Sequence, residues 1–168
     1  MTKDREFEEF ALARIPQLHR SAWLLCGDAH RAEDLVQETL AKVYVRWHRR
    51  LGRPIENPAA YAQTCLVRVF ISAQRRSSTH ERPIEAPVEL AARGDDTDLR
   101  VALAGALGEL QPLDRAVLVL RYLDDRPVAD VAEVLGCSQG AVRSRTLRAL
   151  ERLRAVFGPS LVDLLHHR

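Results

Sequence analysis

Apolar residues recur along this chain at the three- and four-residue spacing of amphipathic α-helices. In the first half, this spacing predicts three helices, over residues 7–25, 30–47 and 57–76. Pro16 interrupts the first of them, and Gly27-Asp28 ends it. Asn57-Pro58 suits the start of the third, because an Asn side chain caps backbone N–H groups and proline fits the first helical turn. No segment shows the alternation of a half-buried strand, so the fold class is predicted to be all-α.

The same spacing predicts a second helical region further along the chain. Residues 77–98 lack periodicity and contain two prolines and a glycine, which is typical of a flexible linker. Beyond them, apolar positions predict helices over residues 99–110 and 112–123, and then a closely spaced pair over 128–157. The chain is therefore predicted to form two small helical domains, residues 1–76 and 99–168, joined by the linker.

The closely spaced pair has the residues that a helix-turn-helix requires. Ala132 is small enough to let the second helix approach, and Gly136 can take a positive φ where the first helix ends. Val142 is placed to point into the angle between the helices, and Ser138 is a good N-cap for the second helix. The pattern favours a DNA-binding motif over an ordinary helical hairpin with a solvated arginine face.

Charge is distributed unevenly between these regions. The chain has 25 lysines and arginines against 23 acidic residues, so it is not a general polycation. Residues 138–157 contain five arginines and one acidic residue, whereas the predicted linker contains six acidic and two basic residues. Arginines on the second helix of the motif can neutralise DNA phosphates, which supports the same prediction.

Several classes of protein are disfavoured by composition. The six histidines and three cysteines show neither metal-ligand nor catalytic spacing, and no glycine-rich phosphate loop is present. We therefore expect no catalytic residues, metal or cofactor. The cysteines give no disulfide framework, which suits a reducing cytoplasm. The N-terminus lacks the pattern of a signal peptide and no apolar run is long enough for membrane insertion, so a cytoplasmic location is expected.

A second polar constellation lies in residues 32–43, AEDLVQETLAKV. Helical spacing places Asp34, Gln37 and Glu38 on one exposed stripe, opposite the apolar positions of the same helix. Taken alone, such a stripe is either a solvated helix face or a docking surface for a basic partner.

The order of these motifs resembles the extracytoplasmic-function (ECF) sigma factors of bacterial RNA polymerase. DLVQETL, a tryptophan, an Asn-Pro that opens an arginine-ended helix, a linker and a C-terminal helix-turn-helix follow one another over residues 7–157. The chain is most similar to the actinobacterial group called SigE-like. The resemblance implies a promoter-specificity subunit whose partners are core RNA polymerase and promoter DNA, with an anti-sigma factor as a further candidate. It also implies that Asp34, Gln37 and Glu38 bind core polymerase.

The resemblance further implies two sets of DNA-binding residues. The loop after the DLVQE helix and the helix after that loop match the parts that capture a flipped base and hold the melted −10 strand. The matching residues are Trp47, His48, Arg49, Arg50, Arg53, Asn57, Tyr61, Arg75 and Arg76. Base capture needs a stacking surface and cationic groups. Trp47, His48 and Tyr61 are the candidates for stacking, although the two larger aromatics are also typical of a helical core.

The second helix of the helix-turn-helix matches the reader of the −35 element. Arg143, Ser144 and Leu147 match the positions that meet base edges, since arginine can bind guanine and leucine can contact a thymine methyl group. Phosphate contacts are expected from Ser138, Gln139, Arg145 and Arg148.

A stand-alone helix-turn-helix regulator is the alternative function. Such a protein would bind a palindromic site as a dimer. It would leave the DLVQE motif and the 57–76 helix without a role, and no clear dimerisation helix is visible in the sequence.

Overall fold

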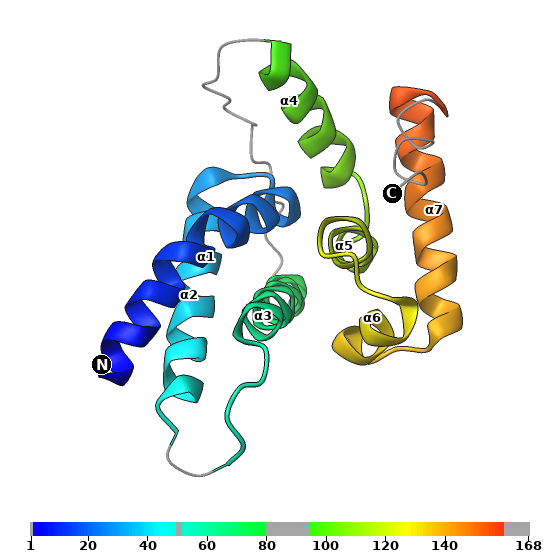
Figure 1. Cartoon of the computed structure of the whole chain (residues 1–168). Coiled ribbons are helices and arrows are strands. Elements are labelled where there is room, and N and C mark those ends of the chain that lie inside the picture. The colour runs from blue at the N-terminus through cyan, green and yellow to red at the C-terminus, as the bar shows by residue number, and fades with distance from the viewer. Residues whose placement is uncertain (1, 50–51, 80–94, 160–168) are drawn as a thin grey trace. The chain divides into compact units, whose positions relative to one another are not determined.

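The structure is a computed structural model that describes residues 2–49, 52–79 and 95–159. Within these ranges every regular element is helical, which confirms the predicted all-α class. The elements, shown in Figure 1, are α1 (Lys3–Cys26), α2 (Ala29–Trp47), α3 (Pro58–Thr79), α4 (Asp95–Gly108), α5 (Pro112–Leu118), the π-helical turn η1 (Val119–Leu123), α6 (Val128–Leu135) and α7 (Gln139–Phe157). No described helix is long and apolar enough to cross a membrane.

The chain divides into two helical units. The first contains α1 up to residue 23, α2 and α3, and the second contains α4 to α7, with residues 24–27 grouped with it. The predicted linker, residues 77–98, overlaps helices at both ends, because α3 continues to Thr79 and α4 begins at Asp95. Residues 80–94, and Arg50 in the earlier loop, lie outside the described residues.

The first unit is built around the apolar faces of its three helices. Its buried residues include Leu18, Ala22, Leu35, Val36, Val43, Leu66, Val67 and Phe70. A buried hydrogen bond from Gln63 to the Ser21 hydroxyl joins α3 to α1. The predicted interruption at Pro16 is wrong, because α1 runs through it as one helix. Proline lacks the N–H that would bond to the Leu12 carbonyl, and both Pro16 and Leu12 are exposed residues on the outer side of the helix.

Local capping sets the ends of these helices. Gly27 takes a φ of +67° where α1 ends, a conformation that suits glycine. The Asp28 carboxylate accepts from the Arg31 backbone N–H at 2.8 Å and starts α2. The Asn57 side-chain oxygen accepts from the Ala60 N–H at 3.0 Å and starts α3, as the sequence predicted. At the end of α2 the His48 N–H donates to the Tyr44 carbonyl at 3.1 Å, so the loop between α2 and α3 is held at both ends by short-range hydrogen bonds.

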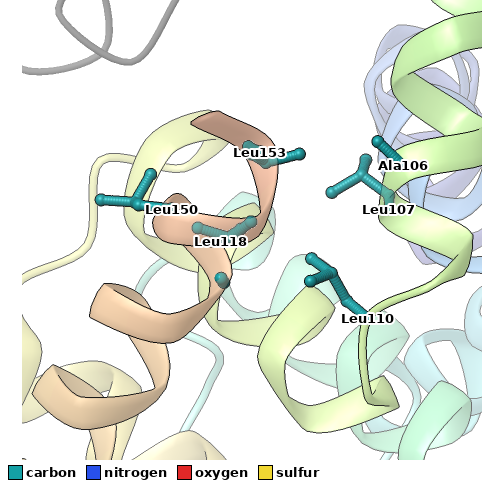
Figure 2. Packing of buried hydrophobic residues seen from close by; sticks show 7 residues of the cluster. Ala106, Leu107, Leu110, Leu118, Leu150 and Leu153 are labelled. Carbon is teal, nitrogen blue, oxygen red and sulfur yellow. The ribbon is translucent and has the colours of Figure 1, made fainter. Parts of the chain in front are cut away.

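In the second unit, α4, α5 and α7 share a leucine-rich core (Figure 2). The buried cluster consists of Ala106, Leu107, Leu110, Leu118, Ala149, Leu150 and Leu153. The helix predicted over residues 112–123 is α5 followed by η1, and the Asp124 N–H reaches back to the Val119 carbonyl at 3.1 Å. This five-residue step is the bond of a π-helix, and it precedes the turn into α6.

Two leucines of α7 are expected to differ in their effect on stability. Leu153 is 3% exposed in the core, whereas Leu147 is 58% exposed on the outer face of the same helix. We expect Leu153→Ala to lower the free energy of unfolding by about 2–4 kcal/mol, because it removes buried methyl groups and leaves a cavity. Leu147→Ala should change it by less than about 0.5 kcal/mol. Urea denaturation followed by circular dichroism measures both, and a larger loss for Leu147→Ala would contradict this packing.

Candidate nucleic-acid and protein interfaces

The turn between α6 and α7 has the geometry of a helix-turn-helix. Gly136 ends α6 in the left-handed conformation with a φ of +63°, and the Cys137 N–H donates to the Ala132 carbonyl at 3.0 Å. The Ser138 hydroxyl accepts from the Ala141 N–H at 3.1 Å and caps α7. Val142 is fully buried in the angle between the helices. Each of these roles agrees with the sequence prediction.

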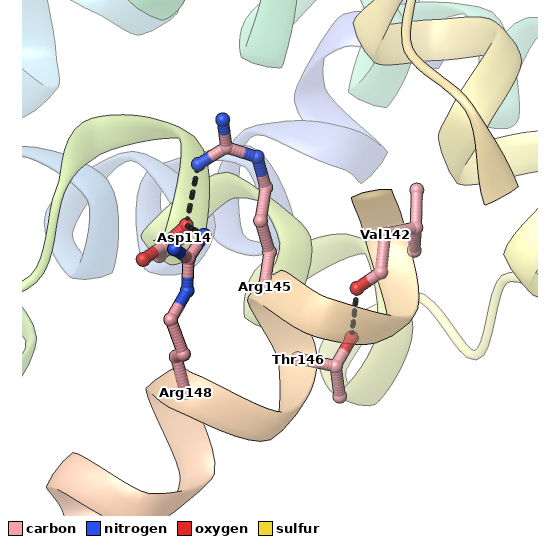
Figure 3. Close-up of polar contacts among 5 residues, drawn as sticks. All are labelled: Asp114, Val142, Arg145, Thr146 and Arg148. Atoms are coloured by element: carbon pink, nitrogen blue, oxygen red, sulfur yellow. Dashed lines mark hydrogen bonds and ion pairs between the residues drawn. The ribbon is translucent and has the colours of Figure 1, made fainter. Parts of the chain in front are cut away.

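The outer face of α7 exposes the residues predicted to read bases. Arg143, Ser144 and Leu147 are all accessible to solvent, and Gln139 at the start of the helix accepts from the Arg143 guanidinium at 3.4 Å. The Thr146 hydroxyl donates to the Val142 carbonyl one turn earlier in α7 at 2.8 Å, so this side chain is bonded to the backbone of its own helix (Figure 3). The arrangement places two polar side chains and one apolar side chain on the exposed side of α7.

Arg145 has a different environment from its neighbours on α7. Its Nη1 lies 2.7 Å from Oδ1 of Asp114 in the first turn of α5, and its side chain is 27% exposed. Arg148 lies 3.9 Å from the same oxygen but is 61% exposed. Figure 3 shows both arginines converging on Asp114. The phosphate-binding role predicted for these two arginines is therefore compatible with the exposure of Arg148, whereas Arg145 is bound within the unit.

The polar stripe of α2 is exposed as predicted. Asp34 and Gln37 are exposed, while Glu38 is 42% exposed and lies 3.5 Å from the Lys42 ammonium. The stripe continues at helical spacing through Ala41 to Val45, which is 63% exposed. Sequence reasoning missed this apolar continuation, although the four-residue steps from Gln37 indicate it.

A pocket of about 360 Å³ lies where α2 ends and the following loop begins. It is lined by Lys3, Arg46, Trp47, Arg49, Gly52, Arg53, Pro54, Ile55 and Pro58. The Arg46 guanidinium donates to the Arg53 carbonyl at 2.6 Å, which ties the loop back to α2. Four of the lining residues are cationic, so the pocket suits an anionic ligand that also carries an apolar or aromatic part.

Aromatic packing accounts for one wall of this pocket. The Trp47 ring lies 5.6 Å from that of Phe7 and 5.1 Å from that of Phe10, so α1 supports it. The centroid of the His48 ring lies 4.1 Å from that of Tyr44, and His48 Nε2 lies 3.0 Å from the Asp4 carboxylate. The Tyr44 hydroxyl donates to the same carboxylate at 3.0 Å, and this interaction raises the pKa of Tyr44.

The remaining predicted −10 residues are divided between the loop and α3. Arg49 and Arg53 are exposed and line the pocket, whereas Asn57 is used as the cap of α3. Tyr61 is half-buried in the first turns of α3, and Arg75 and Arg76 are exposed near its end. Lys3 and Arg46 were missed by sequence reasoning. Arg46 adjoins the predicted set, but no local signal connects Lys3 to the loop.

Comparison with known proteins agrees with this arrangement. Residues 11–79 match the family model for Sigma-70 region 2, and residues 100–153 match that for Sigma-70, region 4. The RNA polymerase sigma-E factor of Streptomyces coelicolor is 34% identical over 152 residues, which span 89% of this chain and 84% of the relative. The ECF RNA polymerase sigma factor SigM of Mycobacterium tuberculosis is 29% identical over 155 residues, which span 90% of this chain and 77% of the relative.

Two solved structures have the same fold. The sigma factor RpoE of Bartonella quintana, solved in complex with the anti-sigma factor NepR, matches with a TM-score of 0.67 and 27% identity over 90% of this chain and 96% of its own. The ECF sigma factor SigJ of Mycobacterium tuberculosis matches with a TM-score of 0.63 and 29% identity, over 88% of this chain and 52% of its own. The two helical units thus define a sigma-70-type transcription factor. The chain belongs to the ECF sigma factors of RNA polymerase, and the resemblance to the actinobacterial group is confirmed.

Proposed function

We propose that this chain is an alternative sigma subunit that binds core RNA polymerase and directs promoter recognition, melting and transcription initiation. The observation that carries the proposal is the presence, in one chain, of an exposed polar stripe on α2 and of an exposed α7 face that contains Arg143, Ser144 and Leu147. A stand-alone regulator would use only the second. The sequence-based limits, residues 1–76 and 99–168, are the proposed domains for −10 and −35 recognition. The anti-sigma factor bound to the Bartonella relative supports a similar protein as a third partner.

Docking on core polymerase is assigned to the α2 stripe. Asp34 and Glu38 supply negative charge and Gln37 supplies amide donors and acceptors, all on one helix face. Leu35 and Val36 hold the opposite face in the core of the first unit. Such a rigid acidic surface suits a basic helical partner. The test is binding of the labelled chain to purified core polymerase near physiological salt, and no binding by the folded protein would contradict the proposal.

Capture of the melted −10 strand is assigned to the cationic pocket at the end of α2. The pocket combines an aromatic wall at Trp47 with the cations Lys3, Arg46, Arg49 and Arg53. Extruding a base costs a few kcal/mol, which stacking and phosphate contacts can offset. The packing of Trp47 against Phe10 supports a partly shielded ring whose remaining surface lines the pocket. We therefore place the flipped base beside Trp47 and its flanking phosphates near the loop arginines.

Removing the two loop cations tests this assignment. We expect Arg49→Ala combined with Arg53→Ala to weaken binding of a single-stranded −10 oligonucleotide to the holoenzyme by about tenfold or more, because each cation contributes to phosphate binding. The slope of log affinity against log salt should become shallower by about 0.7 for each phosphate that is no longer neutralised. Fluorescence anisotropy across a salt series measures both quantities.

Arg31 is a matched control for these variants. It is an exposed arginine at the opposite end of α2, away from the residues that line the pocket. Arg31→Ala should leave oligonucleotide affinity within about twofold, since surface substitutions away from a site have small effects. An equal loss for Arg31→Ala would show that the effect is general electrostatic attraction instead of binding at the pocket.

A further inference from the structure

A buried carboxylate lies directly behind the base-reading face of α7. Among the described residues, Asp114 is the only charged side chain that is buried, with 7% of the residue exposed. Asp114 lies in the first turn of α5, 31 residues from Arg145 in sequence. Its Oδ1 accepts a hydrogen bond from Nη1 of Arg145 at 2.7 Å. A buried charge is retained at low cost only when it is paired and hydrogen-bonded, and Arg145 provides both conditions.

This pair changes what Arg145 can do. Its Nη1 is bonded to Asp114 and its side chain is 27% exposed, whereas the Arg148 side chain is 61% exposed at 3.9 Å from the same carboxylate. Because Asp114 accepts only from Nη1, a phosphate contact by Arg145 would have to use its other N–H groups through the 27% of the side chain that is exposed, or break the short ion pair and leave a buried carboxylate without its closest partner. Arg148 can reach outward without that loss. The two arginines are therefore not equivalent phosphate ligands.

The pair adds a directional contact to the apolar packing of α7. Val142, Ala149, Leu150 and Leu153 are buried on the inner side of the helix. The hydrophobic effect is non-directional, so these contacts determine which face of α7 is buried but do not by themselves orient a polar side chain. A charge-assisted hydrogen bond is directional and short. Arg145 lies between Ser144 and Leu147 in sequence, so fixing it fixes the direction in which both neighbours project.

We propose that Asp114 is a specificity-determining positioning residue, which holds Arg145 and thereby sets the rotation of α7 in the −35 groove. Arg145 is then a structural residue that joins α7 to α5 and does not contact phosphate, while Arg148 contacts phosphate. The inference rests on the proposed −35 role of α7. In this chain, the recognition helix α7 would thus be oriented by Asp114 of α5, a residue that does not itself contact DNA.

The first test is discrimination between two DNAs by holoenzyme assembled from full-length chain. The probes are a promoter fragment selected by wild-type holoenzyme and the same fragment with its −35 bases exchanged. We expect Asp114→Asn and Arg145→Gln each to reduce the ratio of the two affinities by on the order of tenfold, because misdirected base contacts no longer distinguish the fragments. An unfolded fraction lowers both affinities equally, so the ratio remains informative if a variant is destabilised.

The second test is the salt dependence of binding to the selected fragment. Arg148→Gln should lower the slope of log affinity against log salt by about 0.9, as expected for one phosphate contact, and Arg145→Gln should leave it unchanged. A lower slope for Arg145→Gln would overturn the inference, as would an undiminished affinity ratio in either Asp114→Asn or Arg145→Gln. Wild-type holoenzyme that fails to discriminate the fragments would instead contradict the proposed −35 function itself.

Discussion

Charge reversal on α2 is expected to weaken binding to core RNA polymerase by at least about 100-fold. Asp34 and Glu38 lie one helical turn apart on the exposed stripe, so Asp34→Lys with Glu38→Lys replaces two negative charges by two positive ones at a single surface. Losing one desolvated charge pair at an interface typically costs about 2–5 kcal/mol, and about 2.8 kcal/mol corresponds to the predicted 100-fold loss. Equilibrium binding of labelled chain to purified core polymerase measures the effect.

The fold should tolerate this change, which allows a clean control. Both side chains lie outside the core, and the exposed Glu38–Lys42 pair contributes at most about 0.5 kcal/mol. Glu6→Lys with Glu8→Lys makes the same change in net charge at two exposed positions on α1, off the stripe. It should bind core nearly as well as the wild-type chain. If both double variants lost affinity equally, long-range electrostatics and not the stripe would determine binding.

Arg143→Ala is expected to reduce −35 discrimination by about 1–3 kcal/mol at one base pair. Arg143 is exposed at the start of α7 on the face shared with Leu147, and its near neighbour Gln139 already orients its guanidinium. An arginine at such a position can donate two hydrogen bonds to guanine, and alanine can donate none. Holoenzyme affinity for promoter fragments that differ at single −35 positions identifies the base pair that Arg143 contacts.

Arg152 provides the comparison on the same helix. Its guanidinium donates to the Glu109 carbonyl at 3.1 Å, so it is directed toward α4 and away from the predicted base-reading set. Arg152→Ala should leave discrimination unchanged. Were Arg143→Ala to weaken binding to every sequence by the same factor, Arg143 would be a phosphate contact and the base-reading assignment would be wrong.

Most helix ends could be predicted because short-range chemistry determines them. Asp28, Asn57 and Ser138 cap the helices that follow them, and Gly136 ends α6. Each of these roles depends on residues within four positions, so the sequence contains the necessary information. The order of the motifs then identified the family before any contact was known.

Features that depend on the environment could not be predicted in the same way. Pro16 does not end α1, and it lies at an exposed position of the helix. The π-helical turn after Leu118 adds one residue to a helical step, and apolar spacing alone does not distinguish it from an α-helix. The approach of Lys3 to the loop after α2 and of Arg145 to Asp114 joins residues distant in sequence. Without the fold, Arg145 and Arg148 had the same expected role.

Reconstituted transcription is the most direct test of the sigma-factor function. Purified core polymerase free of other sigma factors would be combined with this chain and a library of genomic fragments, and the 5′ ends of the transcripts would be mapped. We predict transcripts that require the chain and start downstream of a shared pair of −35 and −10 sequences. No initiation by core polymerase, together with tight binding of the free chain to a palindromic site, would contradict the assignment and support a stand-alone regulator.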